Sequence, residues 1–156
     1  MIDLKATAVR NGKSIEVLVT GFLNDSCHKA RIFDIYPGGN ISYIVDPGFA
    51  QVFLDETSSQ GSDYCLLVLV PWAESITIPD RSHNEVEIYL NKQEKLQIPV
   101  LSEASSFVVC QLNGFNPNPS CSIVPEGMCN LGHPFKQVFG PGSYQDCLAY
   151  KANKCP

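Results

Sequence analysis

The sequence predicts an all-β fold, an immunoglobulin-like antiparallel β-sandwich followed by a disulfide-rich tail with one short C-terminal helix. Short β-rich runs separated by turn residues recur roughly every 10 residues through the first hundred positions, a rhythm typical of sandwiches. Five of the seven cysteines lie in residues 110–156, and a helix-start signal stands near residue 143. We therefore expect a sandwich domain over residues 1–101 and a cysteine-rich tail or small subdomain over residues 102–156.

The first element expected is a β-hairpin. Residues 6–9 and 14–21 are β-rich, and Ile15, Val17 and Val19 alternate on one face of the second run. Asn-Gly at positions 11–12 is a favoured pair for a type I′ turn, whose twist suits the flanking strands. No helical periodicity competes with this interpretation.

Further strand-length runs follow, and one of them is almost wholly apolar. Residues 64–70 read Tyr-Cys-Leu-Leu-Val-Leu-Val, as expected of a central strand buried on both faces, and Pro71 should end it. Pro, Gly, Asn and Asp mark the turns around the earlier runs. The other predicted strands of the first domain are 30–36, 41–45, 51–54, 75–78, 85–90 and 95–100.

The tail changes composition. A polar linker at 102–106 leads to one more expected strand at 107–110, and the abundance of Pro and Gly between 114 and 142 predicts irregular backbone. Ser143 can cap a C-terminal helix, with Asp146 three residues later as its capping-box partner. A helix of two to three turns is marginal in water, so we expect a disulfide from Cys147 to hold it.

The cysteines predict disulfides and an oxidising compartment. No C-x-x-C pair typical of zinc ribbons or redox sites occurs, whereas clustered cysteines in a small domain are typical of stapled secreted proteins. The first pairing expected is Cys27 with Cys65, and an odd count leaves at least one thiol unpaired within the chain. The candidate disulfide residues are Cys27, Cys65, Cys110, Cys121, Cys129, Cys147 and Cys155.

Composition narrows the compartment and the partners. Eleven Lys and Arg against 16 Asp and Glu give a net charge of -5, which argues against a nucleic-acid partner. The chain has no run of 18 apolar residues, so no membrane span is expected. With the cysteine usage, this predicts a secreted, periplasmic or cell-surface protein from which a signal peptide has been removed.

Catalytic and cofactor-binding residues are not predicted. Cys27 and His28, adjacent on a strand, would point to opposite faces, so they make a poor nucleophile-base pair. No phosphate loop, G-x-S-x-G or H-E-x-x-H motif occurs. We expect no enzyme activity, no cofactor and no resident metal. Four acidic residues in two predicted loops fit no calcium-loop spacing and should be solvated: Asp46, Asp55, Glu56 and Asp63.

The function expected is a non-catalytic binding module with the sandwich as scaffold, and its partner a protein or a cell-envelope component. One alternative is a protease inhibitor that presents a disulfide-braced loop. Another is a zinc-binding protein or enzyme that uses His133 and tail cysteines. The candidate loop consists of Val124, Pro125, Glu126, Gly127 and Met128.

Overall fold

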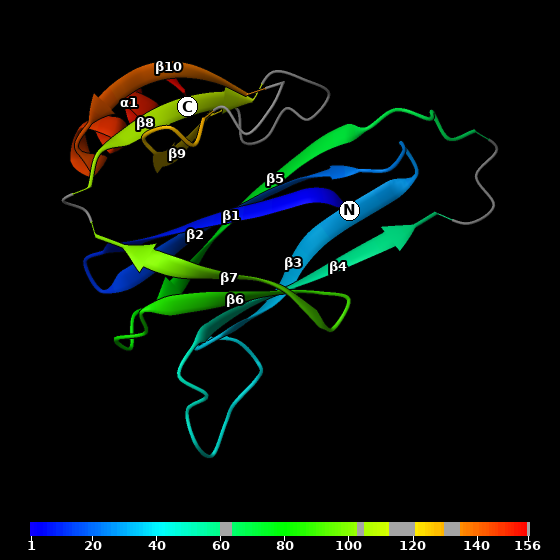
Figure 1. Ribbon diagram of the computed structural model, residues 1–156, viewed down its shortest axis with the longest axis horizontal. Coiled ribbons are helices and arrows are strands. Elements are labelled where there is room, and N and C mark those ends of the chain that lie inside the picture. The colour runs from blue at the N-terminus through cyan, green and yellow to red at the C-terminus, as the bar shows by residue number, and fades with distance from the viewer. Residues whose placement is uncertain (60–63, 103–104, 113–120, 130–134, 156) are drawn as a thin grey trace. The chain divides into compact units, whose positions relative to one another are not determined.

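The computed structural model describes residues 1–59, 64–102, 105–112, 121–129 and 135–155 (Figure 1). The chain forms two compact units, Met1–Val100 and Leu101–Pro156, and each is described by itself. The described residues are mostly in β-strands, with one short helix near the C-terminus. The mostly β fold class predicted from the sequence is confirmed, whereas the immunoglobulin-like topology stays a prediction.

The first unit is built on one seven-stranded sheet with the order β3-β4-β6-β7-β1-β2-β5. The strands are β1 (Ile2–Asn11), β2 (Ser14–Leu23), β3 (His28–Tyr36), β4 (Ala50–Ser58), β5 (Val70–Pro79), β6 (Glu85–Leu90) and β7 (Gln93–Leu101). The expectation of wholly antiparallel pairing is wrong, because β4 and β6 run parallel. Two parallel strands must be joined by a long crossover connection, commonly a helix. Here the connection from β4 to β6 contains strand β5, which lies at the far edge of the sheet.

Two hairpins show how turn residues set the pairing. Asn11 faces Ser14 across the first turn, and of the two central residues only Gly12 has a positive φ, of 61°. That is the pattern of a type II′ turn, so the type I′ expectation is wrong. The β6–β7 turn has positive φ at both Asn91 (50°) and Lys92 (69°), as a type I′ turn requires.

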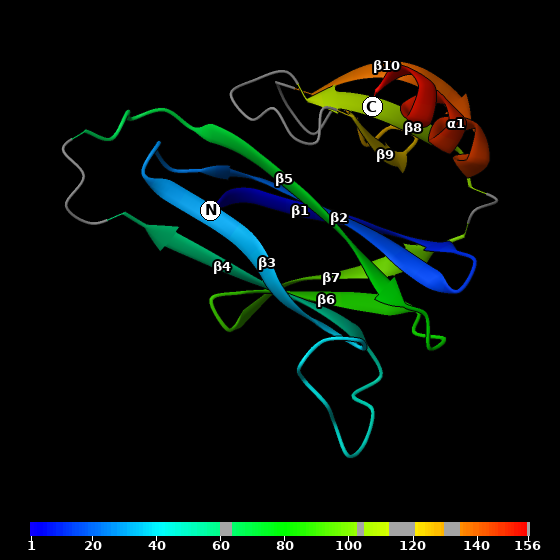
Figure 2. The ribbon, with the colours of Figure 1, turned by 180° about the vertical axis from the view of Figure 1, so that it is seen from behind.

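The sheet curls so that its two halves share one core. Trp72 Nε1 donates a hydrogen bond to the Ala30 carbonyl (3.1 Å), and the Ile32 amide donates to the Glu74 carboxylate (2.9 Å). These contacts bring edge strand β3 close to edge strand β5 (Figure 1 and Figure 2). The core consists of Ala8, Ile15, Val17, Val19, Leu23, Ala50, Val52, Leu54, Trp72, Ile78, Val86, Ile88 and Leu90.

Two predicted strands of this unit are loops. Residues 41–45 lie in the connection between β3 and β4, and the side chain of Ile44 is fully exposed. Residues 64–69 precede β5 and are largely exposed, while Pro71, expected to end a strand, lies inside β5. An edge strand tolerates proline because its outward amides need no partner. Apolar sequence alone cannot separate a buried strand from an exposed run.

The second unit holds a three-stranded sheet with the order β10-β8-β9 and helix α1 (Tyr144–Lys154). The strands are β8 (Phe107–Leu112), β9 (Cys121–Pro125) and β10 (Phe135–Gly142). The strand expected near 107–110 is confirmed. The expectation of irregular backbone is wrong at β9 and β10, where Pro125 and Pro141 are tolerated because both strands are edges.

Helix α1 begins where the sequence predicts. The Ser143 hydroxyl accepts a hydrogen bond from the Asp146 amide (3.1 Å), which satisfies one of the free amides of the first turn. The ring of Tyr144 meets the fully buried Phe107 edge to face, with centroids 5.2 Å apart. Within the described residues, no helix has the length and apolar character needed to cross a membrane.

Candidate functional site

The structure pairs six cysteines. The Cys27–Cys65 disulfide expected from the sequence is present. The other two pairs, in the second unit, are Cys110–Cys129 and Cys121–Cys155. Cys147 is free and fully buried, so the expectation of a disulfide at this residue is wrong. Burial raises the pKa of the Cys147 thiol. Because Cys147 forms no disulfide, helix α1 is held by packing and by the Cys121–Cys155 bond just beyond its last turn.

The loop considered for protease inhibition is a closed turn. Val124 is 2% exposed and belongs to β9, so its side chain lies inside the unit. The Met128 amide donates to the Pro125 carbonyl (3.0 Å), and the Glu126 amide donates to the Ser106 carbonyl (2.9 Å). Gly127, with φ of 85°, occupies the left-handed region. The exposed part is therefore limited to Glu126 and Gly127, with Pro125 and Met128 half-buried.

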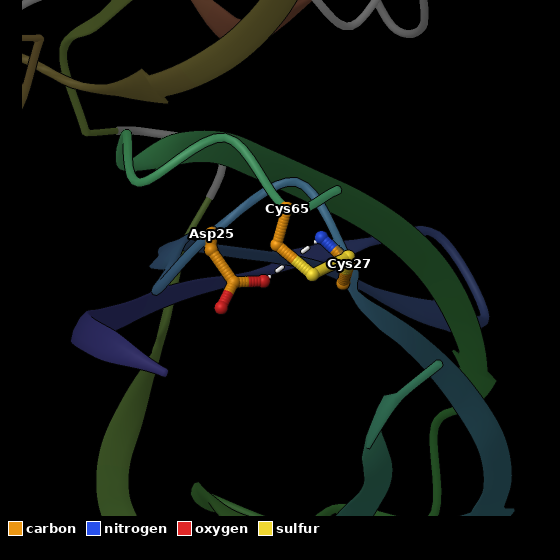
Figure 3. A group of neighbouring side chains, drawn as sticks. All are labelled: Asp25, Cys27 and Cys65. Atoms are coloured by element: carbon orange, nitrogen blue, oxygen red, sulfur yellow. Dashed lines mark hydrogen bonds between the residues drawn. A yellow bond between two sulfur atoms is a disulfide. The ribbon is translucent and has the colours of Figure 1, made fainter. Parts of the chain in front are cut away.

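The zinc alternative loses most of its proposed ligands. His133 lies outside the described residues, and the four tail cysteines other than Cys147 are in disulfides. One described group has metal-ligand proximity: the ligand atoms of Asp25, Cys27 and Cys65 lie within 4.8 Å of one another (Figure 3). Zinc binds thiolates, and the two sulfur atoms of this group are bonded to each other. Asp25 instead accepts the Cys27 amide (2.8 Å).

His83 and Asp46 form a contact that the sequence did not suggest. His83 is 5% exposed, and its Nε2 lies 3.0 and 2.9 Å from the two Asp46 oxygens. The His83 contact, followed by the Gly48 amide, lowers the pKa of Asp46. Nδ1 of His83 is buried and has no hydrogen-bond partner among the described residues. The contact fastens the connection between β3 and β4, and the Asp46 side chain, 46% exposed, is solvated as expected.

The remaining acidic residues behave differently from one another. Asp55 lies 3.6 Å from the Arg31 guanidinium. The Glu56 side chain is only 11% exposed, and its carboxylate lies 3.4 Å from His28 Nδ1. The expectation that Glu56 is solvated is therefore wrong. Asp63 lies outside the described residues. These contacts give Asp55 and Glu56 structural partners.

A stack of aromatic rings and buried polar groups lies on the outer face of β4 and β6. The rings of Phe53 and Tyr89 stack with centroids 5.0 Å apart and 23° between their planes. Glu87 is buried and accepts a hydrogen bond from Gln51 Nε2 (3.0 Å), and a hydrogen bond with Glu87 raises the pKa of Glu94. The stacked faces of Phe53 and Tyr89 cover each other, so a ligand cannot stack between the two rings.

The most unusual surface of the first unit is a run of exposed apolar side chains at residues 64–69, here named the Cys65 loop. The exposed fractions are 91% for Tyr64, 66% for Leu66, 89% for Leu67, 46% for Val68 and 51% for Leu69. Single exposed leucines are normal, but a contiguous apolar patch on a monomer commonly marks an interaction site. The Cys65 loop is therefore our candidate functional site.

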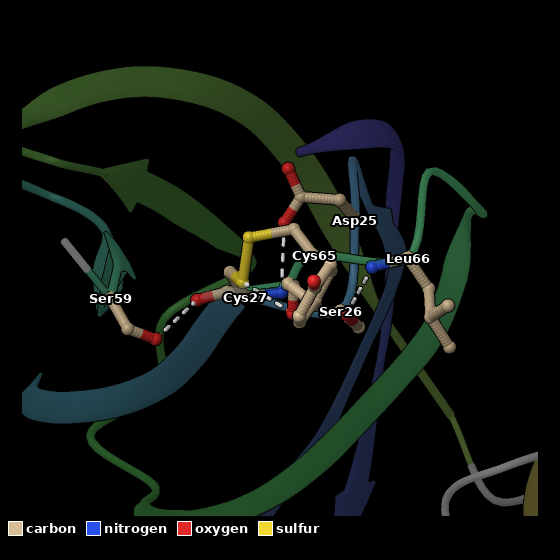
Figure 4. The surroundings of a disulfide bond; sticks show 7 residues. Asp25, Ser26, Cys27, Ser59, Cys65 and Leu66 are labelled. Atoms are coloured by element: carbon tan, nitrogen blue, oxygen red, sulfur yellow. Dashed lines mark hydrogen bonds between the residues drawn. A yellow bond between two sulfur atoms is a disulfide. The ribbon is translucent and has the colours of Figure 1, made fainter. Parts of the chain in front are cut away.

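The base of the Cys65 loop is fixed by covalent and hydrogen bonds (Figure 4). The Cys27–Cys65 disulfide joins it to the start of β3. The Leu66 amide donates to the Ser26 hydroxyl (2.7 Å), and the Ser26 amide donates to the Leu66 carbonyl (3.1 Å). On the other side of the disulfide, the Ser59 amide and hydroxyl donate to the Cys27 carbonyl (3.0 and 3.1 Å). An apolar segment without such bonds would collapse onto the protein and leave water. These bonds hold the Cys65 loop in its exposed position.

The backbone of the loop is bent. The Val68 amide donates to the Leu66 carbonyl (2.8 Å), a hydrogen bond between residues i and i+2 that defines a γ-turn. An extended strand could not make this bond. The loop consequently presents side chains outward, and part of its backbone is satisfied internally.

Basic residues flank a cavity on strands β3 and β4. Lys29 and Arg31, on β3, line a cavity of about 350 Å³ together with Ala30, Asp55 and Thr57. Lys29 pairs with Thr57 across the β3–β4 ladder, two residues from Cys27. The Arg31 side chain is 73% exposed despite its contact with Asp55. The cavity therefore holds two cations and one carboxylate, and Lys29 lies two residues from the disulfide at the base of the Cys65 loop.

Comparisons with known proteins place this chain in no group: no family model matches it, no curated protein matches it, and no solved structure matches it.

Proposed function

We propose that this protein is a non-catalytic extracellular binding module that uses the first unit as scaffold and the Cys65 loop as contact surface. The observation that carries the proposal is the exposure of Leu66 and Leu67, at 66% and 89%, on a loop tied down by a disulfide. Each of these side chains would gain about 1.5–3 kcal/mol from full burial. A partner that covers the loop gains this free energy with little loss of conformational entropy, because the loop is already ordered.

An extracellular location is part of the proposal. Three disulfides are compatible with an oxidising compartment, where such bonds form and persist. A protein or a component of the cell envelope would then be the partner that meets the loop.

The test is binding to fractionated cell envelope from the native source, with the purified full chain as bait. Leu67→Asp should remove most of the bound protein, because it places a charge at the centre of the contact. Ile44→Asp is the matched control, since Ile44 is also highly exposed but lies in the connection between β3 and β4. Equal binding by the wild type and both variants would refute the Cys65 loop as the contact surface.

A further inference from the structure

We propose that the Cys65 loop docks on the surface of a phospholipid bilayer, with its apolar side chains inserted at the level of the acyl chains and Lys29 and Arg31 facing lipid phosphates. This inference rests on the proposed function and names the partner of the same surface. It is carried by the composition of the loop, its bent backbone and the cations at its base.

The composition suits a lipid more than a folded protein surface. No charged residue occurs from 64 through 73, and the exposed side chains of the loop are aliphatic except for Tyr64. Protein interfaces place aromatic and arginine anchors at their centres, whereas aliphatic leucine and valine are the residues that hydrocarbon accepts best. Tyr64 has the amphipathic ring that settles at a membrane–water interface.

The bent backbone favours a lipid over a partner that would add a β-strand. A strand added to a sheet edge is recognised through a row of free amides and carbonyls on an extended backbone. In the Cys65 loop, the Leu66 amide, the Leu66 carbonyl and the Val68 amide already have partners within the chain. Backbone groups that enter an apolar phase must be satisfied internally, and in this loop the Leu66 amide and carbonyl and the Val68 amide meet that demand.

Charge at the base of the loop complements lipid headgroups. Lys29, two residues from Cys27, and Arg31 line a cavity together with Asp55, and Arg31 keeps most of its side chain exposed although it pairs with Asp55. Phosphate is common to zwitterionic and anionic phospholipids. The chain as a whole carries a charge of -5, so the long-range field does not favour an anionic surface. Apolar insertion should therefore dominate, and zwitterionic vesicles should bind the protein.

The experiment measures co-sedimentation of the full chain with phosphatidylcholine vesicles, with and without an anionic lipid. We expect binding to pure phosphatidylcholine, weakened at least about tenfold by Leu67→Asp, since a buried leucine is worth more than one factor of ten. Lys29→Ala should weaken binding to the vesicles that contain anionic lipid by about two- to fivefold, because one cation near the charged surface is lost. Ile44→Asp, the matched control, should bind like the wild type.

A second measurement reports insertion directly. Leu67→Trp places a fluorophore at the most exposed leucine of the loop, whereas the native Trp72 is 7% exposed. On binding to vesicles, the emission of the tryptophan introduced at position 67 should shift to the blue and be quenched by lipids brominated on the acyl chains. Trp72 in the wild type should not be quenched.

Three results would overturn the inference. Loop-dependent binding to cell envelope without binding to lipid vesicles would show a protein partner and leave the proposed function intact. Dimerisation that Leu67→Asp abolishes, without vesicle binding, would show a second copy as the occupant. Absence of binding to either envelope or vesicles would remove both the inference and the proposed function.

Discussion

Removal of the Cys27–Cys65 disulfide should destabilise the first unit and loosen the Cys65 loop. The bond closes a loop with a sequence separation of 38. For that length the chain-entropy relation gives about 4 kcal/mol, near the upper end of what disulfides usually contribute. Domains of this size are stable by about 5–15 kcal/mol, so the loss is large. We expect Cys27→Ala/Cys65→Ala to lower the unfolding free energy by about 2–4 kcal/mol.

Urea unfolding followed by tryptophan fluorescence measures this effect. The chain has a single tryptophan, Trp72, which is 7% exposed and belongs to the core of the first unit. Its emission therefore reports on that unit. The matched control is Cys121→Ala/Cys155→Ala, which removes a disulfide of comparable separation, 34 residues, in the second unit. This control should leave the Trp72 transition unchanged.

One result would refute the reasoning. If the Cys27→Ala/Cys65→Ala variant loses less than about 1 kcal/mol with an unchanged dependence on urea, the disulfide does not hold the base of the loop. The hydrogen bonds of Ser26 and Ser59 would then suffice to keep it in place.

Three further predictions concern the other features of the chain. Cys147 should react with a maleimide only after unfolding, at one thiol per chain, and fast labelling of the folded protein would contradict its buried position. Cys147→Ser should destabilise the second unit by about 1–3 kcal/mol because it buries a hydroxyl. Ser143→Ala should cost the second unit about 1 kcal/mol through loss of the helix cap, measured by thermal unfolding of helix α1, with Ser143→Asp as the variant that retains it. The pKa of Asp46 is lowered in the folded state, so its contribution to stability is present above its ordinary value of 3.8 and is lost as the pH falls through the folded pKa. Asp46→Asn should remove that acid-dependent loss, and an unchanged pH profile in this variant would argue against the His83 contact.

Much of the architecture follows from local patterns. Alternating apolar residues, such as Val86, Ile88 and Leu90, predict strands because one face must leave water. Ser143 at the helix start is equally local, since a cap acts within one turn. Even the Cys27–Cys65 pair was predictable, because these are the first two cysteines of the chain and the other five cluster in the tail.

The candidate site did not follow from the sequence in the same way. Residues 64–70 have the composition of a central buried strand, and nothing local distinguishes that from an exposed loop. Two tertiary facts decide it: a disulfide holds Cys65 at the start of β3, and the sheet places β5 at an edge. Similarly, His83 and Asp46 are 37 residues apart and meet only because the connection between β3 and β4 approaches the turn before β6.

The sequence by itself determined the β content, the capped C-terminal helix, the oxidised cysteines and the absence of a long apolar span, because each depends on residue type over a short stretch. Tertiary structure alone decided the parallel pairing of β4 and β6, the burial of the free Cys147 thiol and the exposure of the Cys65 loop. Pairing partners and burial depend on which distant segments meet, and local propensity carries no information about that choice.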